Sequence, residues 1–358
     1  MVGFEGFNGT DFNGTLDCYW CDENPDFDAL IRLQEYSIKV ELSSAVLVTV
    51  LAPITVTANT LLLGTFWKST SSYFRSPTMY FIIFLSVTDL IIGLLVEPIK
   101  AFCSLDFYLR NRKRSDLCLT LTERVVDVVL PATANASFLI VLALSLSQYL
   151  AVAFPCRFGG LVTVKTVRIS VGVAWGYSLA FSMLQLLWRK ENSFTKALHM
   201  YDLYGHSIAI SSALICLYIL MLKALNRQIR NRNRTSFLKT RDRRSCSVTQ
   251  NNSHPQKTKA TPRMRVMEIQ FIKMNILLII ILLLCTLPTI VVKYIVEVSK
   301  LKRQNGSSSL AEIRMRIIEK IADDVLLVKF MLDAFVYVWR LPRYRKALLN
   351  TISACSCC

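Results

Sequence analysis

The stretch from Val128 to Cys156 reads VVLPATANASFLIVLALSLSQYLAVAFPC and contains no charged side chain. A helix needs about 20 residues to cross the ~30 Å hydrocarbon core of a bilayer, so this run is long enough. Six further apolar stretches are also long enough: 42–67, 79–99, 169–188, 203–222, 274–292 and 321–339. We therefore predict an all-α membrane protein with a seven-transmembrane helix bundle.

The composition excludes several other classes of protein. Hydrophobic residues make up 53% of the 358 residues and charged residues only 19%, whereas soluble domains carry about 25% charged residues. A soluble multidomain protein, a disordered chain and a small disulfide scaffold are excluded on this ground. The alternating segments of about ten residues that mark a membrane β-barrel are not visible either.

The charge distribution predicts the orientation of the bundle. Residues 1–41 hold nine acidic side chains, whereas residues 223–273 hold fourteen Lys and Arg against two acids. The positive-inside rule places the basic segment in the cytoplasm and the N-terminus outside the cell. The basic cluster Arg110–Arg114 runs against this rule. No apolar signal peptide precedes the first span, so we expect that span to direct insertion.

This orientation divides the chain into an extracellular segment (1–41), a helical membrane domain (42–349) and a cytoplasmic Cys-rich tail (350–358). Within it, residues 222–273 form a basic third cytoplasmic loop with helix ends, expected to be irregular and to contact anionic lipid. Two membrane spans flank this loop, so we expect no nucleic-acid partner.

Several side chains are candidates for covalent modification. Glycosylation sequons on the predicted outer side begin at Asn8, Asn13 and Asn305. Palmitoylation is expected at the tail cysteines Cys355, Cys357 and Cys358. The outer cysteines allow either a Cys103–Cys118 disulfide or bridges from these two residues to Cys18 and Cys21.

A set of short motifs follows the seven runs in order: Asn59, Leu85-Ser-Val-Thr-Asp89, Ser147-Gln148-Tyr149, Trp175, Tyr218, Cys285-Thr286-Leu287-Pro288 and Asp333-Ala-Phe-Val-Tyr337. The ordered set resembles the rhodopsin-like (class A) G-protein-coupled receptors over residues 42–349. The resemblance implies an extracellular ligand, a heterotrimeric G protein or arrestin as partner, and a short amphipathic eighth helix at 340–349. It also implies that the usual bridge to the second outer loop is absent, since residues 189–202 contain no cysteine.

The chain departs from the family's pattern at several switch positions. Ser147 and Gln148 replace an acid and an arginine, Thr286 replaces an aromatic residue, and Ala334 replaces a proline. Neutral drift is as good an explanation of Gln148 as a change in function. We predict a seven-helix receptor that binds an extracellular ligand and signals through heterotrimeric G proteins. The alternative is a receptor-like protein with weak G-protein coupling, such as a scavenger or an arrestin-only receptor.

Charged side chains inside the spans predict an internal polar site. Lys329 and Asp333 are four residues apart and share one helix face. In the family, a carboxylate at the place of Asp89 and a hydroxyl like that of Ser137 help to hold a sodium ion, so we expect the Lys329 ammonium to take the cation's place. Asn59 belongs to the same site. The alternative is that Lys329 extends toward water.

The resemblance assigns the remaining candidate residues to two ends of the bundle. The cytoplasmic switch comprises Ser147, Gln148, Tyr149, Tyr218, Glu268 and Tyr337, and the sixth-helix switch Cys285, Thr286 and Pro288. The candidate ligand pocket in the outer half comprises Glu97, Asp127, Leu130, Lys293, Glu297, Asp323 and Asp324.

The pocket residues bear on the ligand. Leu130 stands where amine receptors carry an aspartate, which disfavours a small amine, and Leu327 stands where opsins carry the retinal lysine. The mixed charge favours a peptide or another charged ligand. The sequence contains no metal-ligand spacing and no nucleophile–base motif, so we expect neither a cofactor nor an enzyme. A seven-helix transporter, which would require internal repeats and broken helices, is a weaker alternative, because the order of the motifs speaks against it.

Overall fold

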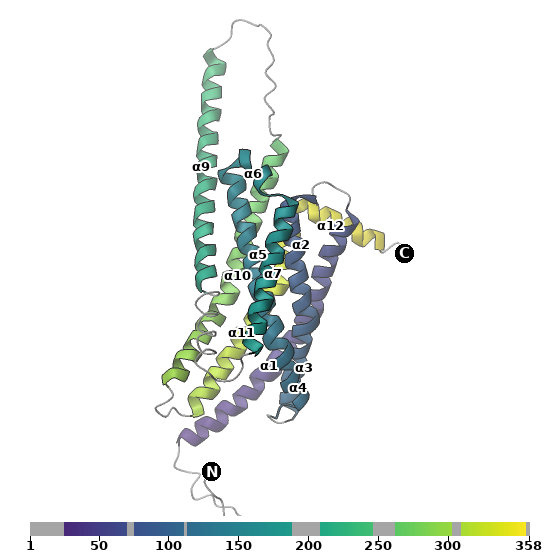
Figure 1. Ribbon diagram of the computed structural model, residues 1–358, viewed down its shortest axis with the longest axis vertical. Coiled ribbons are helices and arrows are strands. Elements are labelled where there is room, and N and C mark those ends of the chain that lie inside the picture. Colours follow the sequence, from purple (N-terminus) through teal and green to yellow (C-terminus); the bar gives the residue numbers. More distant parts are fainter. Residues whose placement is uncertain are drawn as a thin grey trace, which may run out of the picture.

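The computed structural model describes residues 25–69, 75–110, 113–187, 208–245, 262–302 and 309–355, and every regular element among them is helical. Figure 1 shows these helices side by side in one elongated bundle. The long helical rods are α1 (Pro25–Lys68), α2–η2–α3 (Pro77–Ile91, Ile92–Val96, Glu97–Leu109), α4–η3–α5 (Asp116–Leu121, Thr122–Val126, Asp127–Ala153), α7 (Val164–Leu187), α9 (Ala209–Ser245), α10 (Pro262–Lys302) and α11 (Ser309–Arg340). Two shorter helices complete the described chain: α6 (Pro155–Leu161) and α12 (Pro342–Cys355).

The rods correspond to the seven predicted spans. Six of them are long and apolar enough to cross a membrane within the described residues. The seventh, α11, carries Asp323, Asp324, Lys329 and Asp333 in its apolar stretch. It nevertheless packs between α1 and α10, while α5 contacts α2, α7, α9 and α10. The predicted fold class, an all-α membrane bundle, is confirmed.

The helices extend well past the apolar runs, and here one sequence prediction is wrong. The basic segment 223–273 was expected to be irregular, yet α9 continues to Ser245 and α10 begins at Pro262. Figure 1 shows α9 rising beyond the rest of the bundle. Arg, Lys, Leu and Gln are good helix formers, and their charges are easily solvated once a helix leaves the membrane. Residues 246–261 lie outside the described residues.

Two prolines account for local changes of helical pitch. Pro98 has no N–H to donate to the carbonyl of Leu94, and that carbonyl lies inside the π-turn η2. The π-turn η3 ends at Val126, directly before Asp127, whose carbonyl would accept the hydrogen bond that Pro131 cannot donate. A proline in a helix removes one i to i−4 hydrogen bond, and a wider turn accommodates the lost partner. The turn η2 directly precedes α3, and the turn η3 directly precedes α5. Each wide turn rotates the residues on its two sides relative to one another around the helix axis.

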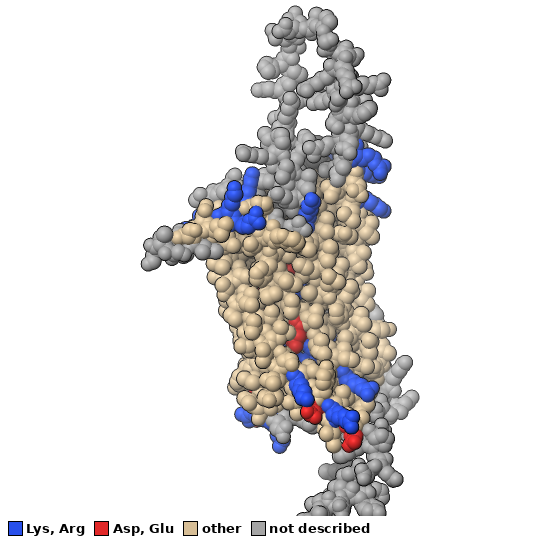
Figure 2. Space-filling view, turned by 180° about the vertical axis from the view of Figure 1, so that it is seen from behind, with Lys and Arg blue, Asp and Glu red and all other residues tan. Residues whose placement is uncertain are grey.

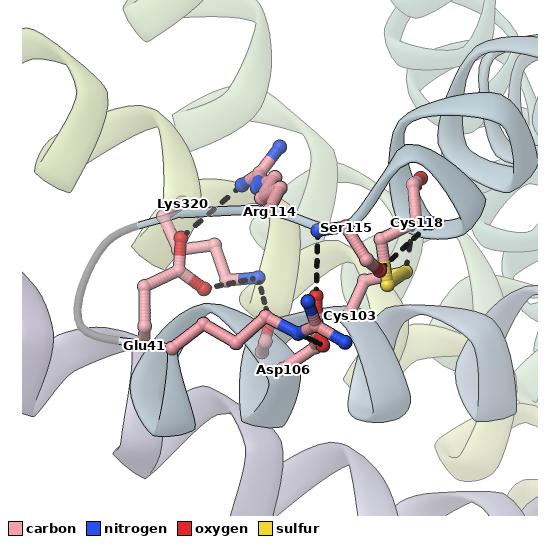
Figure 3. The surroundings of a disulfide bond; sticks show 9 residues. Glu41, Cys103, Asp106, Arg114, Ser115, Cys118 and Lys320 are labelled. Atoms are coloured by element: carbon pink, nitrogen blue, oxygen red, sulfur yellow. Dashed lines mark hydrogen bonds and ion pairs between the residues drawn. A yellow bond between two sulfur atoms is a disulfide. The ribbon is translucent and has the colours of Figure 1, made fainter.

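A disulfide joins Cys103 of α3 to Cys118 of α4, which settles the open alternatives for these two residues. Cys18 and Cys21 lie outside the described residues. Asp106 organises the turn between the two helices, because it accepts a hydrogen bond from the Ser115 backbone N–H (2.8 Å). Figure 3 shows the bridge and this turn beside α1 and α11.

The same turn explains the basic cluster that ran against the positive-inside rule. The Arg110 Nε lies 2.7 Å from a carboxylate oxygen of Asp106. The Arg114 guanidinium lies 3.4 Å from Glu41 of α1 and 5.6 Å from the ring centroid of Phe107. Two of these basic side chains are therefore paired locally, and a paired cation is a weaker topological signal than a free one.

The eighth helix, α12, turns away from the bundle axis at the end opposite the N-terminus (Figure 1). It runs over Pro342–Cys355, so it begins two residues later and ends six residues later than the expected 340–349. Tyr344 anchors it, since this side chain is buried and its ring stacks on Phe66 of α1 at 6.3 Å. Burial against α1 raises the pKa of Tyr344 to about 12.

The outer surface of the bundle fits a lipid environment. In Figure 2, basic side chains gather at both ends of the visible face, and the band between them is almost entirely uncharged. Large apolar residues are exposed on the outside of the bundle, such as Val173 of α7 (66% exposed) and Leu284 of α10 (66%). A soluble protein rarely exposes so many apolar side chains together.

We expect the Cys103–Cys118 bridge to stabilise the outer end of the bundle. Replacing both residues by serine should lower the free energy of unfolding by about 3 kcal/mol. Closing a loop of about fifteen residues lowers the conformational entropy of the unfolded chain, which raises its free energy by about that amount. Mass mapping of non-reduced peptides and thermal unfolding of both proteins measure this. Alkylation of both thiols in the folded, unreduced wild type would contradict the assignment.

Candidate functional site

Lys329 lies at the centre of a buried charge cluster. Lys329 is buried among the helices, with only 1% of the residue exposed. Its Nζ donates a hydrogen bond to the Ser137 Oγ of α5 at 2.6 Å. The same atom lies 2.8 Å from the Asp333 carboxylate and 3.7 Å from the Asp89 carboxylate of α2. Lys329 thus points into the bundle and not toward water.

The cluster links three transmembrane helices through one cation. Asp89 and Asp333 are both buried, and two carboxylates in a low dielectric repel each other and lose their hydration. One ammonium between them offsets part of this cost, and the Ser137 hydroxyl accepts a further hydrogen bond from it. The Nζ also lies 4.4 Å from the centroid of the Phe330 ring. Such an arrangement connects α2, α5 and α11 at one level of the bundle.

Asn59 of the predicted internal polar site and Tyr337 of the predicted cytoplasmic switch are both buried. The Asn59 amide donates to the Thr55 carbonyl of its own helix at 2.9 Å. Tyr337 lies one turn beyond Asp333 on α11. Membership of Asn59 in the charge cluster and the roles of both residues in switching stay predictions.

At the opposite half of α5, two of the predicted switch residues, Ser147 and Gln148, are buried. The Ser147 hydroxyl donates to the Leu144 carbonyl of its own helix at 2.8 Å, and Gln148 is 5% exposed. Tyr149 and Tyr218 are half-buried. Glu268 belongs to a turn of α10 whose side chains lie outside the described residues, so the Gln148–Glu268 contact stays a prediction.

The structure adds a polar contact that the sequence analysis missed. The Asn275 amide of α10 donates to the Ser145 hydroxyl of α5 at 3.2 Å, and both side chains are buried. Asn275 is a single amide inside the charge-free run 274–292, which was the available signal. This pair ties the third and sixth spans close to Gln148.

The sixth-helix motif lies in the middle of α10. Cys285 and Thr286 are buried, and the Thr286 hydroxyl donates to the Leu282 carbonyl at 2.7 Å. Pro288 is inside the helix and exposed on its surface. Thr286 is much smaller than the aromatic residue expected at this position in the family, and its hydroxyl is hydrogen-bonded within its own helix. A change of its rotamer would therefore move little volume in the core.

The candidate ligand residues face different partners. Glu97 of α3 is buried against Thr55 of α1 at 3.3 Å, and Asp323 pairs with Lys100 at 3.2 Å. The side chains of Asp127 and Lys293 are exposed. Leu130 is buried in the apolar core. The side chain of Glu297 lies outside the described residues. The described members of this set thus have different surroundings, and their contact with ligand stays a prediction.

The modification sites fall where the structure gives no side chain. Asn8, Asn13 and Asn305 lie outside the described residues, as do Cys357 and Cys358. Cys355 is the last residue of α12, and its side chain is also outside the described part. Glycosylation and palmitoylation stay predictions.

Comparison with known proteins agrees with this architecture. Residues 58–319 match the family model of the 7 transmembrane receptor (rhodopsin family). The chain is 32% identical to the D(1C) dopamine receptor of Xenopus laevis over 152 residues, which are 40% of this chain and 31% of that receptor. It is 33% identical to the histamine H2 receptor of Cavia porcellus over 187 residues, which are 52% of this chain and 46% of that receptor.

A more distant match has the same character. The chain is 28% identical to the adenosine receptor A2b of Canis lupus familiaris over 134 residues, which are 37% of this chain and 38% of that receptor. The chain thus spans 31% to 46% of the length of these three relatives. All three relatives are receptors and none is an enzyme, as the sequence predicted.

We expect Lys329 to make the buried site independent of sodium. Lys329→Ala should destabilise the protein by about 3–5 kcal/mol, because it leaves two buried carboxylates without their cation. Adding Asp333→Asn should recover much of this loss, since one of the stranded charges is then gone. Thermal unfolding in sodium chloride and in choline chloride, for the wild type and both variants, measures the effect. Stabilisation of the wild type by sodium would show that the ammonium does not fill the site.

Proposed function

We propose that this chain, which belongs to the rhodopsin family of seven-transmembrane receptors, binds an extracellular ligand and signals through heterotrimeric G proteins at the plasma membrane. The observation that supports this most is the buried cluster of Asp89, Lys329 and Asp333, which joins three spans at mid-bundle. A ligand that binds two bundle arrangements with different affinity shifts their populations. A charge cluster shared between helices is sensitive to small movements of those helices.

The ligand is proposed to be a peptide or another charged molecule. The outer ends of α1, α3 and α11 carry paired charges of both signs, including Lys100 with Asp323 and Lys320 with Glu41. A charged ligand can exchange partners with such pairs at little electrostatic cost. Two of the relatives are named for dopamine and histamine, but Leu130 gives this chain an apolar side chain where an amine's counter-ion is expected.

A nucleotide-exchange assay tests the proposal. The purified full chain in nanodiscs is mixed with each class of heterotrimeric G protein and challenged with libraries of peptides and charged metabolites. We expect ligand-dependent exchange on at least one G protein. Ligand binding without exchange on any member of the panel would instead support the second candidate, a scavenger or arrestin-only receptor, which Gln148 in place of the family's arginine favours.

We propose that an uncharged hydrogen bond between α5 and α10 stabilises the inactive arrangement of the bundle. Gln148 lacks the charge of the arginine that pairs with an acid in relatives, and it cannot form a bidentate ion pair. The buried Ser145–Asn275 pair lies one turn further into the bundle. A neutral hydrogen bond contributes about 1 kcal/mol, so this tie is weaker than an ion pair and easier to open.

We expect Asn275→Ala to raise basal nucleotide exchange by about fivefold, because it removes about 1 kcal/mol from the resting arrangement. The Ser145 hydroxyl is not stranded by this change, since it also donates to the Val141 carbonyl at 2.7 Å. Ser86→Ala is the matched control: this buried hydroxyl donates only within α2, to the Ile82 carbonyl at 3.1 Å. Equal basal exchange in Asn275→Ala and Ser86→Ala at matched expression would refute the tie.

The proposed orientation has its own test. An N-glycanase should remove glycans at Asn8 and Asn13, so that the wild-type band shifts by more than the band of the double Asn→Gln variant, which on the predicted outer side keeps only the Asn305 sequon. An epitope inserted near Thr249 should be labelled only after permeabilisation, because the basic segment is proposed to be cytoplasmic. Labelling of that epitope on intact cells would reverse the orientation.

A further inference from the structure

A groove of about 340 Å³ lies between α1 and α11, toward the ends of these helices nearest the N-terminus of α1. Its walls are mostly apolar and include Val40 and Leu47 of α1 and Val325 and Val328 of α11. Leu47 at its edge is 39% exposed. The groove therefore opens sideways, toward the surface that the surrounding lipid covers, and not into the centre of the bundle.

One acidic side chain lines this apolar groove. Asp324 is only 7% exposed and lies at the groove wall together with Ser44. The Ser44 hydroxyl donates a hydrogen bond to one Asp324 carboxylate oxygen at 3.0 Å. Within the described residues, no Lys or Arg nitrogen comes within ion-pair distance of this carboxylate.

The neighbouring charges are already paired with one another. Lys100 pairs with Asp323 at 3.2 Å. Lys320 lies 3.2 Å from Glu41 and donates to the Ser104 hydroxyl at 2.7 Å, as Figure 3 shows for the Glu41 contact. Among the described residues, Asp324 is thus not in direct ion-pair contact with a cation, although Lys320, one turn earlier on α11, and Lys100 act on its charge from farther away. It is the acid that lines the groove.

We propose that this groove binds a membrane-dissolved amphiphile that has a primary ammonium head and a single alkyl chain. The head would form a charge-assisted hydrogen bond with Asp324, which is stronger than a neutral one. The chain would lie along the apolar walls of α1 and α11, which is favourable in proportion to the apolar area covered. The site rests on the geometry of α1 and α11 and is separate from the proposed G-protein signalling.

The test uses the purified full chain in phosphatidylcholine nanodiscs and a diazirine analogue of hexadecylamine as the probe. Unlabelled hexadecylamine and hexadecanol compete for the site, since they share the chain and differ only in the head. We expect crosslinks on residues 36–47 and 321–328, and competition by the amine at least tenfold stronger than by the alcohol. Asp324→Asn should reduce the apparent affinity for the amine at least tenfold.

Two variants control for charge and for folding. Glu35→Gln removes one acid from the same end of α1, where Glu35 is exposed and paired with Lys39 at 2.9 Å, and should leave labelling unchanged. Val325→Phe fills the groove, keeps Asp324, and should reduce labelling. Equal competition by amine and alcohol, unchanged labelling in Val325→Phe, or crosslinks spread evenly over all helices would each overturn the proposal. Absence of G-protein exchange would not affect it, because binding is measured directly.

Discussion

The buried ammonium of Lys329 is the constraint on which the rest of the bundle depends. Removing a charge from water costs several kcal/mol unless other groups replace its hydration. Here Asp89, Asp333 and Ser137 replace it, and they come from α2, α11 and α5. The cluster therefore requires that three helices meet at one height and one rotation. A sodium ion could leave and let the helices part, whereas a tethered cation stays with α11.

Polar contacts also fix the two ends of the bundle, and this has a physical reason. Lipid chains are as apolar as leucine, so the hydrophobic effect contributes little to the choice of partner between membrane helices. Hydrogen bonds and ion pairs then carry much of the specificity. At one end Glu41, Lys320 and Ser104 connect α1, α11 and α3; at the other, Ser145 and Asn275 connect α5 and α10. These contacts and the central cluster set the register at three levels.

The sequence was a good guide to the fold and to part of the site. Apolar length identified the seven spans, and the spacing of Lys329 and Asp333 placed them on one face. Helix ends were not predictable in the same way, because hydropathy reports where lipid lies and not where the backbone stops being helical. The Ser145–Asn275 pair was missed for another reason: it joins residues 130 positions apart, and its formation depends on the rotation of two helices that no local pattern specifies.

The polarity of α11 follows from its neighbours. A helix with five ionisable residues between Lys320 and Asp333 would be a poor membrane span if lipid surrounded it. Because α11 packs between α1 and α10, much of its circumference faces protein. Asp323 and Asp324 show the consequence. Successive residues are about 100° apart around a helix, so the first reaches Lys100 of α3 and the second turns to Ser44 of α1. Two adjacent acids thus have different partners, and only the second lines the groove between α1 and α11.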